Sequence, residues 1–421
     1  MAQAERQQQC DTYRWIVLAA VCTLAFMTTG TRSTLGVFFK SIVNELGWSR
    51  GTISMVVAVN IWLSGLLQPF TGHVLDRYGA KWLFTGSVAV FSGGVTLISF
   101  THSGGYLLLI YGVVMSTAIA GVSMSLMNAL VAQSFPDYRR GLAIGINNAG
   151  AAMGQLCLVW VSAMLLQAVG WRLSHMYIGI ALLALTVPVA LLLPSQHRPS
   201  KRTSQSHDIL PTVRGPLETE QWQKALQSTP LWQINAGYFV CGMTVALYYT
   251  HLIPFATDRG FSTATAASAF GLLSVCSAIG ALISGAVSDR LGRKNVLGLA
   301  YAVRAVAFAV ILFWRHDLAL YTFAVFAGLS WLATPAPVMA LTGEVYGMRT
   351  LGTLGGISLL VHQLGGGASV WLAGGLYDLT GSYELSFTLG LLALVGASVV
   401  SFTIAERHYS VRYVVAARPV G

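Results

Sequence analysis

The sequence predicts an all-α integral membrane protein with 12 transmembrane helices in two pseudo-symmetric six-helix bundles. Apolar residues make up 55% of the 421 positions and charged residues only 10%, against about 25% charged residues in a soluble domain. Twelve apolar stretches have the length of about 20 residues that crosses a hydrocarbon core of about 30 Å. Two separate motifs also recur later in the chain at one common offset, which indicates duplicated halves.

The twelve stretches follow one another with short polar loops between them. The first begins after a Gln-rich polar segment and is too long for the apolar region of a signal peptide, so we expect a retained helix. The expected helices are 13–38, 51–72, 82–101, 105–132, 141–166, 173–194, 231–255, 264–287, 295–314, 318–342, 352–375 and 384–404.

The two sides of the membrane receive unequal numbers of basic residues, and this difference predicts the orientation of the chain. With the N-terminus inside, 18 of the 25 Lys and Arg residues face the cytoplasm, five face outward and two, Arg32 and Arg304, lie within helices. This asymmetry predicts a multi-pass protein of the inner or plasma membrane with both termini cytoplasmic. The net charge of +10 therefore belongs to loops beside the lipid bilayer, and we expect no nucleic-acid partner.

A polar segment divides the chain into halves. Residues 195–229 contain Pro, Ser and mixed charges between the sixth and seventh helices. We expect an N-terminal bundle over 1–194, a cytoplasmic linker over 195–229, and a C-terminal bundle with a cytoplasmic tail over 230–421. Gly47-Trp48-Ser49 in the first half recurs in the second as Gly260-Phe261-Ser262.

The second repeated motif carries a family resemblance. The loop pattern G-x-x-x-D-R-x-G-x-[RK] after helices 2 and 8 resembles the signature of the major facilitator superfamily. The resemblance implies alternating access by rocking of two bundles, with this loop as a conformational latch. The latch residues are Gly72, Asp76, Arg77, Gly79 and Lys81 in the first half and Gly285, Asp289, Arg290, Gly292 and Arg293 in the second.

A narrower resemblance concerns the entry of helix 5 and the end of helix 11. Residues 138–150 are similar to a pattern of monocarboxylate porters, with departures at Asn147 and Asn148, and residues 374–383 resemble a segment of oxalate/formate exchangers. Those relatives carry a substrate-binding Arg on helix 8. Here 264–287 contains no charged residue, so either the anion anchor has moved to another helix or the substrate is not a carboxylate.

Four groups that can carry positive charge lie in the middle of expected helices, and the acids lie at helix ends or in loops. The four are Arg32, His251, Arg304 and His362. Because ionisable groups inside a bilayer cost free energy, they indicate function by default. Their common sign favours an anionic ligand over a cationic drug.

Arg32 and His362 are the main candidates for substrate binding. Arg32 lies in the outer half of helix 1, which lines the cavity in this superfamily, and its fork suits a carboxylate; snorkelling to the surface is the alternative. His362 lies at mid-depth in helix 11, where oxalate exchangers have a Lys. It could couple a proton to the anion, or be a neutral histidine satisfied by a carbonyl.

The remaining candidates each have a structural alternative. Arg304 on helix 9 is the reserve anchor, or is hydrogen-bonded to helix-capping carbonyls. We expect helix 7 to bend near Pro254, with its aromatic residues as a gate or as an interfacial belt. Asn128 and Asn147 could donate to a carboxylate or join helices. Further candidates are Tyr248, Tyr249, His251 and Trp331 for the ligand and Gly145, Gly150 and Gly154 for close helix packing.

The sequence predicts a transporter and no enzyme. It contains no nucleotide-binding or hydrolase motif, and the scattered Cys10, Cys22, Cys157, Cys241 and Cys276 predict neither metal nor cofactor. We expect proton-coupled symport of small monocarboxylates such as lactate or pyruvate, with a small organic anion and a proton as partners and a monomer as the usual state. The alternatives are an organic anion exchanger of the oxalate/formate type, an exporter of neutral or hydrophobic compounds, and a non-transporting receptor, against which the latch motifs argue.

Overall fold

A computed structural model describes most of the chain as helix. The described residues are 2–195, 217, 219, 221–314, 316, 318–347 and 350–410. No strand occurs among them, which confirms the all-α prediction. Most of the predicted linker at 195–229 lies outside the described residues, as do the side chains of the latch residues Asp76 and Asp289.

The helices account for twelve membrane crossings. Ten stretches of the described residues are long and apolar enough to cross a membrane. One of them, Gly141–Leu191, contains two helices that meet at Gly170, where φ is 75° and ψ is 172°. The apolar, glycine-rich α15 (Leu351–Thr380) has 30 residues, more than the roughly 20 that a bilayer requires. The twelve-helix fold class is therefore confirmed.

The helices form two compact units. Unit 1 contains residues 1–202 and 252–274, and unit 2 contains 203–251 and 275–421. The end of the seventh crossing and the start of the eighth thus belong to unit 1. The bundle limits predicted from the sequence stay a prediction.

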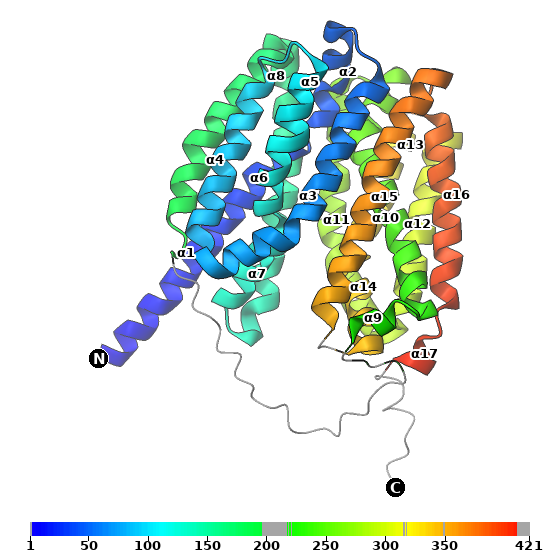
Figure 1. Ribbon diagram of the computed structural model, residues 1–421. Helices are drawn as coiled ribbons and strands as arrows, with labels where there is room; N and C mark the ends of the chain where they lie inside the picture. Colours follow the sequence, from blue (N-terminus) through cyan, green and yellow to red (C-terminus); the bar gives the residue numbers. More distant parts are fainter. Residues whose placement is uncertain are drawn as a thin grey trace. The chain divides into compact units, whose positions relative to one another are not determined.

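Unit 1 is built around two long helices that pack side by side. The first, α1, lies along α8, and α4 lies along the other part of α8 (Figure 1). The elements are α1 (Ala2–Arg32), α2 (Leu35–Leu46), α3 (Arg50–Tyr78), α4 (Ala80–Ile98), α5 (Gly104–Leu107), the π-helix η1 (Leu108–Val114), α6 (Met115–Gly121), α7 (Met124–Ser134) and α8 (Asp137–Leu191).

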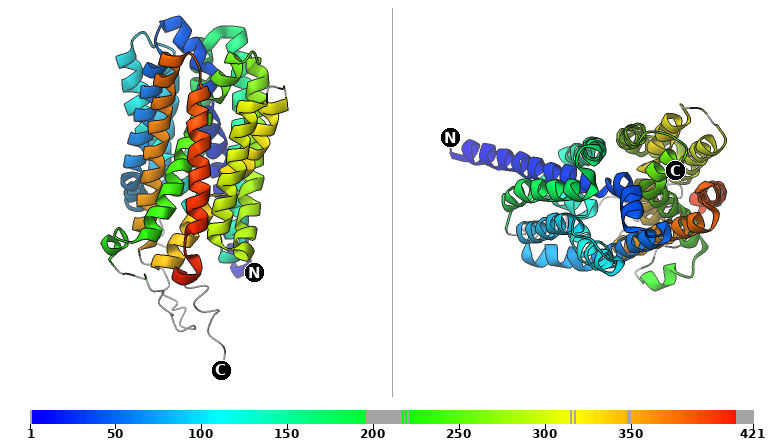
Figure 2. Two further views of the ribbon diagram at one scale, coloured as in Figure 1. Left: turned by 90° about the vertical axis from the view of Figure 1, so that its right-hand side faces the viewer. Right: turned by 90° about the horizontal axis from the view of Figure 1, so that it is seen from above.

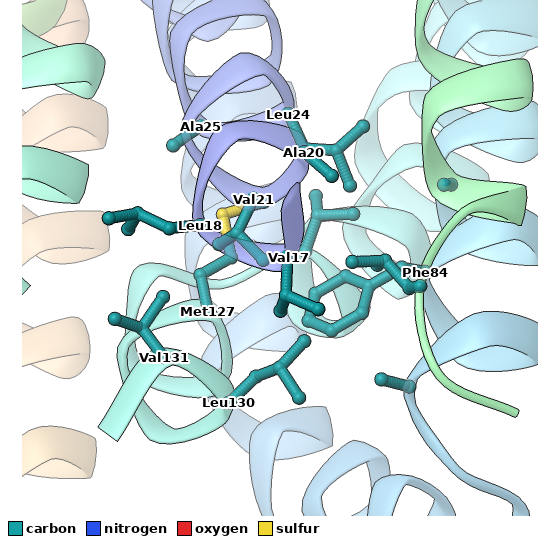
Figure 3. Close-up of a cluster of buried hydrophobic side chains, with 14 of the residues drawn as sticks. Val17, Leu18, Ala20, Val21, Leu24, Ala25, Phe84, Met127, Leu130 and Val131 are labelled. Carbon is teal, nitrogen blue, oxygen red and sulfur yellow. The ribbon is translucent and has the colours of Figure 1, made fainter. Parts of the chain in front are cut away.

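The core of unit 1 joins α1, α4 and α7 through branched and aromatic side chains. Val17, Val21 and Leu24 of α1 face Met127 of α7 and Phe84 of α4 (Figure 3). All five are at most 1% exposed. Because lipid is as apolar as these side chains, their close packing, more than exclusion from water, holds the helices together.

Small residues let α1 approach α8 closely. A Cβ atom at Gly154 would overlap the carbonyl oxygen of Phe26, and one at Gly150 would overlap the Cys22 sulfur. At Gly145 an added Cβ meets no atom within 4 Å. The packing role predicted for Gly150 and Gly154 is therefore confirmed, and the same prediction for Gly145 is wrong.

Unit 2 is centred on α12, which packs against α16 and α13 (Figure 2). Both carboxylate oxygens of Glu406 accept hydrogen bonds at the start of α12, from the backbone N–H groups of Arg293 and Lys294 at 2.7 and 3.2 Å. The elements from α9 onward are α9 (Trp222–Ala225), α10 (Thr229–Asp258), α11 (Thr263–Leu291), α12 (Arg293–Phe313), α13 (Leu318–Trp331), α14 (Pro335–Tyr346), α15, α16 (Glu384–Thr403) and α17 (Glu406–Tyr409). Of these, the end of α10 and the start of α11 belong to unit 1.

The sequence repeat recurs as repeated hydrogen bonding. The hydroxyl of Ser49 accepts from the backbone N–H of Thr52 at 3.1 Å and caps α3. The hydroxyl of Ser262 accepts from the N–H of Thr265 at 3.0 Å and caps α11 in the same way. The two pairs are separated by the same offset as the repeated motifs, so the duplication extends to individual caps.

The latch loops share one backbone turn. Gly79 has φ 83° and ψ 167°, and Gly292 has φ 92° and ψ 150°. Each residue precedes the first residue of the next helix in a conformation that side chains rarely adopt. Glycine is therefore required at both latch positions.

Several crossings are interrupted within the described residues. The first breaks between α1 and α2, the fourth between α6 and α7, and the tenth between α13 and α14. By contrast, α10 runs unbroken from Thr229 to Asp258 with Pro254 inside it. The bend predicted near Pro254 therefore does not end the helix, whereas the tenth crossing is interrupted just before Pro335.

Candidate functional site

Arg32 ends α1 at the break in the first crossing. The chain turns through Ser33 and Thr34, whose backbone N–H groups donate to the carbonyls of Gly30 and Thr31 at 3.0 Å each. The Arg32 side chain is half-buried and makes no hydrogen bond or ion pair with the described part of the chain. A guanidinium is thus held at an irregular point of a membrane helix with its donors available.

His362 is held between α15 and α10. Its ring packs against Tyr238, with 4.6 Å between ring centroids, and its Nδ1 lies 3.4 Å from Oε1 of Gln363. A Cβ atom at Gly242 would overlap the His362 backbone carbonyl, so the two helices touch here. His362 is half-buried.

Arg304 of α12 is completely buried and surrounded by acceptors. Its Nε donates to the Ser330 hydroxyl at 3.3 Å, and one Nη donates to the Cys241 sulfur and the Thr244 hydroxyl at 3.3 and 3.2 Å. The other Nη donates to the carbonyls of Ser330 and Trp331 at 2.5 and 3.3 Å. These contacts use all five N–H donors of a guanidinium, so in this arrangement Arg304 has none left for a substrate.

His251 is also enclosed by protein. Its Nε2 lies 3.3 Å from the carbonyl oxygen of Val370, and its Nδ1 lies 3.2 Å from the Tyr383 hydroxyl. Because a carbonyl can only accept, the Nε2 atom carries the hydrogen and Nδ1 accepts from tyrosine. With 0% exposure, His251 joins α10 to α15 and to Tyr383, the residue before α16, and both of its ring nitrogens have protein partners.

Three predicted aromatic residues form one cluster in unit 2. The Trp331 ring lies 5.7 Å from Tyr248 and 5.9 Å from Tyr249 between centroids, edge-to-face in both cases. Tyr248 is fully buried and its hydroxyl lacks a hydrogen-bond partner in the described residues. Tyr249 and Trp331 are half-buried, so part of each side chain is exposed.

The predicted asparagines form a chain in unit 1. The Asn147 amide donates to the Asn128 oxygen at 2.9 Å, and the Asn128 amide donates to the Asn148 oxygen at 3.1 Å. Each of the two donor amides therefore uses an N–H group in a hydrogen bond to the next asparagine, and this series of hydrogen bonds joins α7 to α8. This geometry favours the helix-joining alternative for both predicted residues.

The latch in unit 2 is tied to two acids that the sequence analysis did not select. Nε of Arg293 donates to Oε1 of Glu344 at 3.3 Å, and one Nη donates to the Ser288 hydroxyl at 2.5 Å. Glu406 caps the following helix, as described above. The acids lie 51 and 113 positions beyond Arg293, so only tertiary structure identifies them.

A charge cluster at the predicted outer side was also missed. Within unit 1, Asp258 accepts from both terminal nitrogens of Arg50 at 2.5 and 3.0 Å and from Lys40 at 2.8 Å. The three residues come from α10, α3 and α2. The sequence did contain an indication of this cluster. Arg50 occupies the position that corresponds to Thr263 in the second half, so the two halves differ here by one charge.

We expect Asp258→Asn to lower stability and Arg50→Gln to add little further loss in the double variant. The Arg50 and Asp258 side chains are 10% and 24% exposed, so their coupling should fall between exposed and fully buried pairs, at about 1–3 kcal/mol. A double-mutant cycle on thermal unfolding in detergent measures it. Additive losses in the double variant would contradict the pairing.

The comparisons with known proteins agree with this architecture. The profile of the Major Facilitator Superfamily matches residues 21–370 and 235–413. The chain is 25% identical to an uncharacterized MFS-type transporter YcxA of Bacillus subtilis, across 92% of this chain and 94% of that protein. It is 23% identical to human monocarboxylate transporter 12, across 91% and 79%, and 22% identical to the oxalate:formate antiporter of Oxalobacter formigenes, across 86% and 85%.

The fold also resembles solved transporter structures. The nucleoside transporter NupG superposes with a TM-score of 0.75 at 15% sequence identity, covering 92% of this chain and 100% of that one. At this identity the likeness concerns the fold alone.

Proposed function

Because this chain belongs to the major facilitator superfamily, a family of membrane transporters, we propose that it moves small monocarboxylates with a proton by alternating access. Arg32 carries the proposal. It is a half-buried guanidinium at a helix break and has no partner among the described residues. A carboxylate can accept two parallel hydrogen bonds from such a fork.

The relatives support a small organic anion as substrate. Two of them are named for monocarboxylates and for oxalate and formate. No acid of the described residues forms an ion pair with Arg32, so an incoming anion would supply the missing charge. Burying a charge without a partner is costly, which makes a bound anion favourable at this position.

In this proposal His362 takes part in proton coupling. Imidazole is the side chain type that changes its charge near neutral pH, and His362 is half-buried beside Tyr238. The proton would be carried by this imidazole or by the carboxylic acid itself. The half-buried Tyr249 and Trp331 would contact the apolar part of the substrate.

Export of uncharged compounds is the second candidate. It is favoured by α11, because Thr263–Ser284 contains no charged residue, whereas the resembled porters place an Arg on this crossing. An anion exchanger is the third, and it would require a counter-anion.

Uptake into liposomes containing the purified protein distinguishes these functions. The panel consists of labelled lactate, pyruvate, acetate and oxalate and a neutral sugar, each with and without an inward proton gradient. We expect lactate or pyruvate uptake that saturates and rises with the gradient. Uptake only after preloading with a second anion would mean exchange, and absence of all carboxylate flux would reject the proposal in favour of uncharged compounds.

A further inference from the structure

The break between α13 and α14 exposes backbone groups inside the membrane. The first helix ends at Trp331, the second begins at Pro335, and residues 332–334 form a turn. The last carbonyl groups of a helix receive no hydrogen bond from an N–H group of the same helix. Pro335 cannot supply one, because proline has no backbone N–H. In a bilayer such groups must find donors elsewhere in the protein.

Arg304 supplies those donors from a neighbouring helix. One Nη donates to the carbonyls of both Ser330 and Trp331, the last two residues of α13. The C-terminal end of a helix carries partial negative charge, which compensates a guanidinium that has no carboxylate among its partners. The remaining Nη reaches Thr244 and Cys241 of α10, so one side chain joins three helices at the break.

The same contacts determine where the Trp331 ring lies. The Trp331 carbonyl is bound by Arg304, and the Trp331 ring packs against Tyr248 and Tyr249 of α10. Within the turn, the Thr334 hydroxyl forms a hydrogen bond with the Cys241 sulfur at 3.1 Å. The turn and the ring are therefore both fixed to α10. Removing Arg304 would take away the charged donors of both carbonyls, would leave the Trp331 carbonyl with the Thr334 hydroxyl at 3.4 Å, and would free the turn to move.

We propose that Arg304 is a positioning residue that caps the broken tenth crossing and holds Trp331 at the substrate, without touching the substrate itself. The role of Trp331 rests on the proposed function. The cap itself depends only on the contacts above. Arg304 and Arg32 are both intramembrane arginines. They differ because the N–H donors of Arg304 are all bound to protein acceptors.

Hydrogen–deuterium exchange on the full-length protein without substrate tests the cap. In Arg304→Gln, we expect exchange in a peptide covering 326–334 to rise at least about tenfold, because charged hydrogen bonds that hold the helix end are lost. Exchange in 360–370 of α15 should stay unchanged. Arg304→Lys, which keeps a charged donor, should restore part of the protection, and Thr244→Val should have a smaller effect because the carbonyl contacts remain.

Transport kinetics test the positioning. In Arg304→Lys we expect KM for the carboxylate to rise about three- to tenfold with little change in the maximal rate, since the Trp331 ring is displaced but the anion anchor remains. Loss of saturable binding with unchanged exchange at 326–334 would show that Arg304 binds the anion and overturn the proposal. Unchanged exchange with unchanged kinetics would overturn it as well. If the wild type moves no carboxylate, the proposed function fails while the exchange result still decides the cap.

Discussion

Replacing Arg32 by Gln should reduce saturable carboxylate uptake by about 10- to 100-fold, which corresponds to the roughly 1.5–3 kcal/mol of a hydrogen bond to a charged group. The glutamine keeps a polar side chain of similar reach and removes the charge and the fork. Because Arg32 has no partner in the described residues, its removal leaves no protein group unpaired. The folded state should therefore keep its thermal stability while transport falls.

Two matched variants accompany this measurement. Arg14→Gln removes the same charge from the same helix, α1, near the predicted cytoplasmic end, and should leave uptake within about twofold. Arg32→Lys keeps the charge without the bidentate fork and should retain intermediate uptake. Wild-type kinetics in Arg32→Gln would remove this residue from the site, and equal losses in Arg14→Gln would indicate a general effect of charge on insertion.

The fold was predictable because its signals are local or repeated. Apolar length predicts each crossing without knowledge of its neighbours, and the common offset of the repeat links Ser49 with Ser262 in matching caps. Pro254 does not end its helix, because a proline can be accommodated inside a packed membrane helix. The chain continues through it in α10.

The site was less predictable because roles depend on partners distant in sequence. Arg32 and Arg304 look alike in the sequence as single charges in apolar helices. One has no protein partner in the described residues, and the other has five acceptors, contributed by Cys241, Thr244, Ser330 and Trp331. Which intramembrane arginine is available to a ligand is therefore a property of the packed helices.

Gly154→Ala should cause the largest loss of stability. The added Cβ would overlap the backbone carbonyl of Phe26, and a Cβ at Gly30 would lie 2.5 Å from the Gly154 carbonyl oxygen. Both obstacles are backbone atoms, which cannot turn aside as a side chain can. We therefore expect α1 to move away from α8. The loss of folding free energy should be at or above the upper end of the roughly 1–3 kcal/mol that overpacking costs. A lower melting temperature and a lower folded yield measure it.

Gly145→Ala is the internal control for this prediction, because it adds the same methyl group to the same helix where no atom lies within 4 Å. Alanine also favours helix over glycine by about 1 kcal/mol, so Gly145→Ala should be neutral or stabilising. Equal melting temperatures in the two variants would contradict the close contact of α1 with α8. Since Arg32 lies just beyond Gly30 on α1, Gly154→Ala should also impair uptake, but together with stability, whereas Arg32→Gln should lose uptake alone.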